Sequence, residues 1–276
     1  MPTIIVATDF SEVATHAVEY ACQLSQDING SITLFHSYTI PITMGDMPFP
    51  AMTAEEATQL ATTKMNEQVA GLQQTYPHIA INTVISFGDV VDGLQDLITT
   101  EKPLMIVLGN NGTKDQLMWL GSNIVTAMRT LKVPVLGVTL DCDYRLPQSI
   151  CYACDFKTND NVAIATDIKH IITLFNAALT VLYIDHQAET DIDELQKEMV
   201  GSYLFETLKP FQPTYRFQGK NKINTTIEEF VASNGMDWLI VVPRKHSYLE
   251  QLFGKTHTEA LVQKTTVPIL ALHEGA

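Results

Sequence analysis

The sequence has few basic residues, few cysteines and no long apolar run. It carries 17 lysines and arginines against 31 aspartates and glutamates, which gives a formal net charge of −14. Such a surface repels phosphate backbones, so general binding of nucleic acids or anionic membranes is not expected. Four cysteines in 276 residues do not make a disulfide framework, which agrees with a reducing compartment.

The sequence also lacks the marks of targeting segments and of common catalytic sites. No basic stretch precedes the first apolar run, which is too short for a signal peptide. No apolar stretch approaches the roughly 20 residues that a membrane span needs. No Ser-His-Asp arrangement, paired-carboxylate motif or Walker lysine can be argued from the spacing. We therefore expect a cytoplasmic, soluble protein that is not an enzyme.

The sequence contains the same succession of predicted strands and helices twice. An apolar strand opens each copy, at 4–9 and at 149–155, and a Val-Pro-Val/Ile-Leu strand closes it, at 133–139 and 267–272. Between these strands, apolar runs alternate with helical periodicity, which predicts an α/β fold with a parallel sheet covered on both faces. The further predicted strands are 32–38, 79–86, 104–108, 179–185, 214–218 and 238–242, and the main predicted helices are 54–74, 90–100, 122–130, 161–177, 190–208 and 223–234. We predict two domains, 1–142 and 147–276.

The first copy carries glycines after its fourth strand. That strand runs into Gly109 and Gly112, and Gly121 and Ser122 follow after an eight-residue spacer. Glycine lets a ligand approach the backbone closely, and the free amides at a helix start favour anions. The segment therefore predicts a phosphate site, which Asp9 would also line if the first and fourth strands are neighbours. The alternative is that these glycines only shape a connection from strand to helix.

The second copy lacks this glycine pattern. Its fourth strand runs into Pro243, Arg244, Lys245 and His246, and only Gly254 roughly matches the later glycine pair. Side chains would intrude where a backbone must approach a phosphate. The basic residues there predict either a small patch for an anionic ligand or partner, or an ordinary solvated loop.

These residues make the sequence resemble the universal stress protein family, as a tandem of two such domains. The resemblance rests on residues 4–11, on residues 109–122 and on the repeated Val-Pro-Val/Ile-Leu ending. It implies two doubly wound, five-stranded parallel sheets of order 3-2-1-4-5, which are Rossmann-like and similar to adenine nucleotide alpha hydrolases. The domains would form an internal pseudo-dimer through their closing strands, and further homo-dimerisation stays open.

The resemblance also implies a function in signalling or the stress response. ATP or another adenine nucleotide, with or without magnesium, would lie between the first and fourth strands of the first domain. By motif position, the implied binding residues are Ala7, Asp9, Leu108, Gly109, Asn111, Gly112, Gly121, Ser122 and Asn123. The family motif has a nine-residue spacer, so the alternative is an interaction scaffold of the same fold that binds no nucleotide. Either function needs a protein partner, which the sequence does not identify.

Three further features have two interpretations each. The pair Cys151-x-x-Cys154 invites a redox or metal role, but residues three apart in a strand face opposite sides, which favours packing. His36 lies late in a strand near the expected crevice, where we expect a structural role, with backbone contact to a ligand as the alternative. The Met- and Phe-containing loop at 41–52 predicts either packing or an adaptable binding surface.

Overall fold

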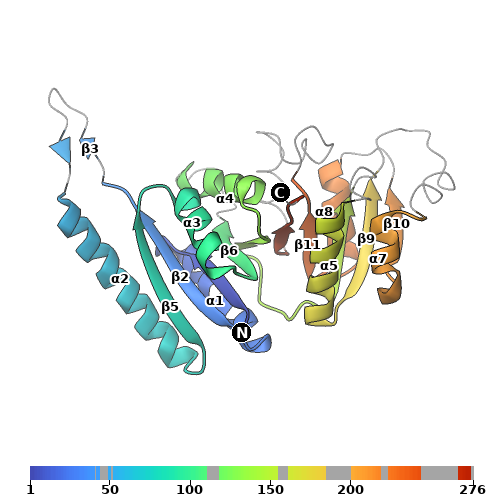
Figure 1. Ribbon diagram of the computed structural model, residues 1–276, viewed down its shortest axis with the longest axis horizontal. Coiled ribbons are helices and arrows are strands. Elements are labelled where there is room, and N and C mark those ends of the chain that lie inside the picture. Colours follow the sequence, from blue (N-terminus) through green and yellow to red (C-terminus); the bar gives the residue numbers. More distant parts are fainter. Residues whose placement is uncertain are drawn as a thin grey trace. The chain divides into compact units, whose positions relative to one another are not determined.

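The computed structural model describes residues 1–40, 42–43, 49–50, 52–110, 118–154, 161–184, 200–218, 223–243 and 267–274. These residues belong to two compact units, Met1–Gly109 and Asn110–Ala276. Each unit is an α/β structure with a mostly parallel sheet (Figure 1). Because this division follows spatial contacts rather than the sequence repeat, the domain limits 1–142 and 147–276 stay a prediction. None of the described helices is long and apolar enough to cross a membrane.

The first unit contains parallel strands in the order β5-β2-β1-β6. Its strands are β1 (Thr3–Ala7), β2 (Ser31–Tyr38), β5 (Ala80–Phe87) and β6 (Met105–Asn110), with a short antiparallel ribbon of β3 (Ile42–Thr43) and β4 (Phe49–Pro50). Its helices are α1 (Glu12–Asp27), α2 (Ala54–Thr75) and α3 (Val90–Glu101). The bounds of β1, β2, β5, β6, α2 and α3 agree with the predicted ranges to within two residues.

Caps determine where these helices begin. The Ser11 hydroxyl accepts a hydrogen bond from the Ala14 amide at 3.2 Å, which makes Ser11 the N-cap of α1. At the start of α2, the Thr53 amide donates to the Glu56 carboxylate at 2.8 Å, and the Glu56 amide donates back to the Thr53 hydroxyl at 3.2 Å. This capping box satisfies two amides that the helix itself leaves free.

The strand order of the first unit reverses between β1 and β6. Ala7 at the end of β1 lies opposite Phe35 of β2 on one side and Leu108 of β6 on the other. The chain leaves β1 toward β2 and later returns to the other side of β1. The sequence prediction that the first and fourth strands are neighbours is therefore confirmed, and their carboxyl ends form a switch point of the kind at which open α/β sheets bind ligands.

Alternation along β2 determines which residues face which helix. The Thr33 hydroxyl donates to the carboxylate of Glu101 at the end of α3 at 2.8 Å. On the opposite face, the Tyr38 and Thr58 hydroxyl oxygens are 2.6 Å apart, which ties the end of β2 to α2. His36 shares the face of Tyr38, so its side chain points to the side that α2 covers.

The second unit contains strands in the order β10-β9-β8-β11-β12-β7. Its strands are β7 (Val135–Thr139), β8 (Ser149–Cys154), β9 (Ala178–Ile184), β10 (Thr214–Gln218), β11 (Trp238–Val241) and β12 (Ile269–Ala271). Its helices are α4 (Met118–Thr130), α5 (Val162–Phe175), α7 (Tyr203–Leu208), a 3-10 turn (Lys209–Phe211) and α8 (Ile223–Ser233). Of the predicted helix at 190–208, residues 190–199 lie outside the described residues.

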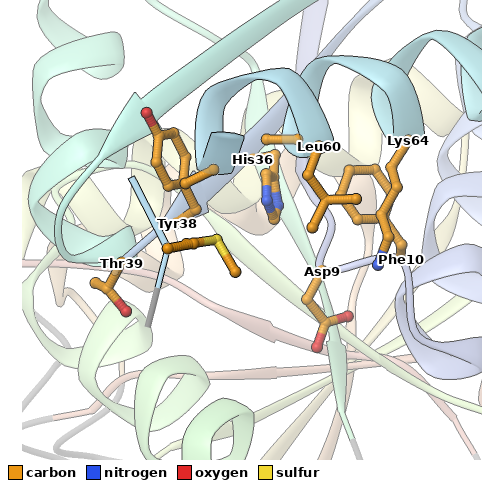
Figure 2. Close-up of a pocket in the computed structure, with 10 residues that line it drawn as sticks. Asp9, Phe10, His36, Tyr38, Thr39, Leu60 and Lys64 are labelled. Atoms are coloured by element: carbon orange, nitrogen blue, oxygen red, sulfur yellow. The ribbon is translucent and has the colours of Figure 1, made fainter. Parts of the chain in front are cut away.

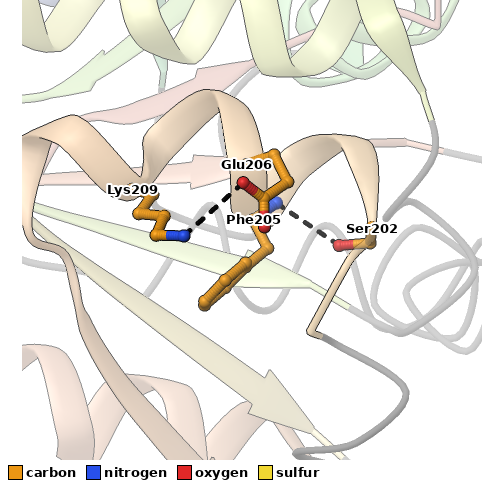
Figure 3. Close-up of polar contacts among 4 residues, drawn as sticks. All are labelled: Ser202, Phe205, Glu206 and Lys209. Carbon is orange, nitrogen blue, oxygen red and sulfur yellow. Dashed lines mark hydrogen bonds and ion pairs between the residues drawn. The ribbon is translucent and has the colours of Figure 1, made fainter.

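The helix α7 is short, buries Leu204 and Leu208, and begins at an N-cap (Figure 3). The Ser202 hydroxyl accepts a hydrogen bond from the Phe205 amide at 3.3 Å. Lys209 lies 3.7 Å from the Glu206 carboxylate, and its ammonium lies 5.9 Å from the centre of the Phe205 ring. Both members of this ion pair are exposed, so water screens it and it contributes little.

The two predicted closing strands pair with each other inside the second unit. β12 runs antiparallel to β7, with Ile269 opposite Gly137 and Leu270 opposite Leu136. A Cβ on Gly137 would lie 2.8 Å from the Met128 Cε and 2.9 Å from the Ile124 Cδ1. Glycine at this position therefore lets α4 pack closely on β7. The two closing strands are therefore neighbours in the sheet.

Cys151 and Cys154 both lie in β8 and are fully buried. Burial raises the pKa of the Cys151 thiol to about 12. A reactive cysteine needs a lowered thiol pKa and access to solvent. These two observations agree with the packing role that the strand position predicts.

Candidate functional site

The turn between β1 and α1 is held by side chains that accept backbone hydrogen bonds. The Thr8 hydroxyl accepts from the Phe10 amide and the Asp9 Oδ1 accepts from the Ser11 amide, both at 3.0 Å. These bonds hold Phe10 at a φ of 65°, a left-handed conformation that costs about 1–2 kcal/mol for a residue with a Cβ. Such strain is characteristic of functional sites.

Phe10 belongs to a small cluster of aromatic and cationic side chains. Its ring centre lies 4.5 Å from that of His36, with 46° between the two planes. The Lys64 ammonium, which α2 supplies, lies 5.7 Å from the Phe10 ring centre. This distance suits a cation–π contact, which is worth about 0.5–1 kcal/mol at an exposed site.

His36 is held in one tautomer by the backbone of β1. Its Nδ1 lies 2.7 Å from the Thr8 carbonyl oxygen, and a carbonyl can only accept, so Nδ1 carries the proton. Burial lowers the pKa of His36, an effect that the Thr8 carbonyl and the Asp9 carboxylate oppose and that Lys64 reinforces. The imidazole is therefore neutral at pH 7, and its Nε2 is a hydrogen-bond acceptor.

These residues line a pocket of about 200 Å³ in the first unit (Figure 2). The turn after β1, the end of β2 and the beginning of α2 form its walls. Its lining residues are Asp9, Phe10, His36, Tyr38, Thr39, Met52, Ala57, Leu60, Ala61 and Lys64. Most of these side chains are apolar, and Figure 2 shows the imidazole of His36 between Tyr38 on one side and Asp9 and Phe10 on the other. Such a lining suits a flat, largely apolar ring that carries a few polar groups.

Four of the predicted binding residues come together at the switch point beside this pocket. Ala7 and Leu108 are cross-strand partners at the ends of β1 and β6, and Asp9 and Gly109 follow them. Of these four, Asp9 lines the pocket. A Cβ on Gly109 would lie 2.8 Å from the Val13 carbonyl oxygen. Close packing alone therefore accounts for glycine at position 109, as the alternative interpretation of the glycines expects.

The other predicted binding residues are not brought to the pocket by any described contact. Asn111 and Gly112 lie outside the described residues, as do the second-copy residues Asp155, Arg244, Lys245, His246 and Gly254. Gly121, Ser122 and Asn123 lie within α4. The prediction that a helix begins at Ser122 is wrong, because α4 begins at Met118 and takes Trp119 and Leu120 into its first turn. Because α4 begins at Met118, the backbone amides left free at its start belong to residues before Gly121.

Sequence reasoning missed the contribution of α2 and of the aromatic residues. Ala57, Leu60, Ala61 and Lys64 follow the helical spacing of one face, and this spacing was the available signal. His36 was expected to be structural, and its hydrogen bond to Thr8 agrees with that role, but its ring also lines the pocket. From the predicted Met- and Phe-containing loop, Met52 reaches the pocket, whereas the side chains of residues 41–51 lie outside the described part.

Comparison with known proteins gives a family and several similar folds. The profile of the universal stress protein family matches residues 1–139. A universal stress protein from Archaeoglobus fulgidus DSM 4304 has a similar structure, with TM-score 0.73, 16% identity, and coverage of 99% of this chain and 98% of that one. A putative universal stress protein from Pseudomonas aeruginosa UCBPP-PA14 has TM-score 0.55 and 14% identity, over 99% of this chain and 93% of that one. At such identities these two comparisons show similarity of fold alone. No curated protein matches the chain.

Proposed function

The chain belongs to the universal stress protein family, and we propose that its first unit binds an adenine nucleotide. The observation that carries this proposal is the position of the pocket. It lies at the carboxyl end of β1 and β2, beside the β1/β6 switch point, and Asp9 belongs to both the pocket and the predicted binding residues. The base would occupy the pocket, and the ribose and phosphates would extend toward Gly109 in β6.

The lining supports a base rather than a phosphate inside the pocket itself. Leu60, Ala57 and Ala61 offer apolar surface to a ring, and Phe10 adds an aromatic wall. Lys64 is exposed at the rim, where a cation favours an anionic ligand in a chain of net charge −14.

We propose binding without catalysis. Hydrolysis needs a positioned water and a general base, and Asp9 is the carboxylate that lines the pocket. One oxygen of its carboxylate already accepts the Ser11 amide. The protein would then act in the stress response or signalling by reporting the nucleotide to a protein partner.

The second unit supports a tandem arrangement. Its β8, β9, β10 and β11 repeat the parallel order of the first unit, and the antiparallel pairing of β7 with β12 is the contact expected of an internal pseudo-dimer. The similarity to a universal stress protein along 99% of the chain agrees with two domains of one fold. Cytoplasmic location and any further homo-dimerisation belong to the same proposal.

One observation favours the second candidate function, an interaction scaffold that binds no nucleotide. The pocket of about 200 Å³ is below the roughly 300–1,000 Å³ of ordinary ligand sites. If no nucleotide binds, the pocket is a small surface hollow and Gly109 serves close packing alone.

Isothermal titration calorimetry with ATP, in the presence and absence of magnesium, separates the two functions. We expect wild-type protein to bind and Leu60→Glu to lose binding, because a carboxylate would enter the apolar wall and repel the phosphates. Gln59→Glu is the matched control, since it adds the same charge on the same helix at a residue that does not line the pocket. If neither wild type nor Gln59→Glu releases heat at millimolar ATP, the scaffold function is favoured.

A further inference from the structure

The polar groups that remain available in the pocket are mainly acceptors. The Tyr38 hydroxyl is paired with Thr58 at 2.6 Å. Asp9 uses Oδ1 for the Ser11 amide, which leaves Oδ2 as an acceptor. Among the described residues, no group bonds to the Nε2 of His36. The donors at this site are the Lys64 ammonium, which lies over the Phe10 ring, and the Thr39 hydroxyl, which can also accept.

The acceptor at Nε2 is fixed by geometry. Rotating the imidazole by half a turn would replace Nδ1 by a carbon atom and break its 2.7 Å hydrogen bond to the Thr8 carbonyl. Phe10 packs against one side of the ring at 4.5 Å, and Tyr38 stacks near the other, with ring centres 6.5 Å apart and 17° between planes. The ring is therefore held in one orientation, and no described residue bonds to its Nε2.

We infer that His36 is a specificity-determining residue, which accepts a hydrogen bond from the amino group of the base and thereby selects 6-aminopurine over 6-oxopurine nucleotides. This inference rests on the proposed function, because it concerns the same pocket. An adenine ring offers an amino group with two N–H donors to the Asp9 and His36 acceptors. The ring of an inosine nucleotide places a carbonyl oxygen at that position, so two acceptors would face each other and both would lose their hydrogen bonds with water.

The size of the effect follows from the chemistry of unpaired polar groups. A site that hydrogen-bonds a donor of its ligand discriminates strongly against an analogue without that donor. Leaving one acceptor unpaired at a half-buried site weakens binding at least about tenfold. ATP should therefore bind at least about ten times more tightly than inosine triphosphate at pH 8.

Acid should reduce this preference, because protonation turns Nε2 from an acceptor into a donor. The charged groups that face the ring are Asp9 from the turn after β1, which favours the imidazolium, and Lys64 from α2, which opposes it. Among the described residues, Tyr38 is the other titratable neighbour, and its hydroxyl is held by Thr58. Burial is the largest influence and lowers the pKa of His36 below 6.5. The ratio of the two affinities should therefore be constant from pH 8 to 7 and fall only in acid, at a pH below the usual titration range of histidine.

Calorimetric titration with ATP and with inosine triphosphate, at pH 8 and at pH 5.5, tests the inference. The variants are His36→Phe, which keeps a ring without an acceptor, and Gln59→Glu, a control on α2 at a residue that does not line the pocket. We expect at least about a tenfold preference for ATP in wild type and in Gln59→Glu, and a clearly smaller ratio in His36→Phe, in which Asp9 remains as the other acceptor.

The possible failures are distinguishable. If wild type binds neither nucleotide, the proposed function fails and the inference with it. If wild type binds both equally at pH 8, the inference fails and the proposed function stands, and this outcome does not depend on how well any variant folds. An unchanged preference in a folded His36→Phe, with a melting temperature close to that of wild type, would assign the selection to other groups and overturn the inference.

Discussion

Replacing Gly109 by alanine should destabilise the first unit, because the new methyl group would meet backbone. An ideal Cβ at this position would lie 2.8 Å from the carbonyl oxygen and 3.0 Å from the carbonyl carbon of Val13. Ordinary contacts between carbon atoms are about 3.5–4.0 Å. Val13 lies in the first turn of α1 and is 4% exposed, so it cannot move aside without disturbing the helix start. Overpacking of this kind costs about 1–3 kcal/mol.

Urea unfolding followed by circular dichroism measures this cost. Gly109→Ala should lower the free energy of unfolding by about 1–3 kcal/mol. Gly71→Ala is the matched control, because no atom lies within 4 Å of a Cβ there and the residue is inside α2. Alanine at that position should stabilise the protein by about 0.5–1 kcal/mol, since it reduces the freedom of the unfolded helix segment. If Gly109→Ala were as stable as wild type, the assignment of this glycine to close packing would be wrong.

Three further substitutions or modifications probe the fold. Asp237→Ala should lower the free energy of unfolding by about 1–3 kcal/mol, because Oδ2 of Asp237 accepts the Gln148 and Ser149 amides at 2.9 Å each; an unchanged urea midpoint would contradict this. Lys102→Gly should raise that free energy by about 1 kcal/mol, since Lys102 ends α3 at a φ of 47°, and a lower midpoint would count against it. Cys151, with a thiol pKa raised to about 12 by burial, should resist iodoacetamide at pH 8 until urea unfolds the protein; peptide mass spectrometry that finds native labelling would refute its burial.

The sequence predicted the strands and their neighbours because periodicity and apolar runs are local signals. Ala7 and Leu108 lie opposite each other as predicted, since parallel strands of an α/β sheet place their carboxyl ends at one edge. The cap at Ser11 also depends on a local signal, because the serine hydroxyl accepts a hydrogen bond from the amide three residues after it.

The pocket itself could not be predicted, for two physical reasons. Helical spacing shows that Leu60 and Lys64 share a face, but it does not show which strand end that face covers. The left-handed conformation of Phe10 depends on hydrogen bonds from its own turn, and its residue type gives no sign of it because aromatic residues rarely adopt positive φ. The early start of α4 was missed because Gly121 and Ser122 have the residue types of a helix start and Met118 does not.

Amide NMR of the labelled full chain with and without ATP tests the central claim most directly. If the first unit binds the nucleotide, saturating ATP should shift the amide signals of three segments together: the turn with Asp9 and Phe10, the end of β2 at His36 and Tyr38, and the face of α2 around Leu60. Those segments line the pocket, and signals distant from it should stay in place. A spectrum that ATP leaves unchanged, or shifts confined to residues outside these segments, would contradict nucleotide binding in the first unit.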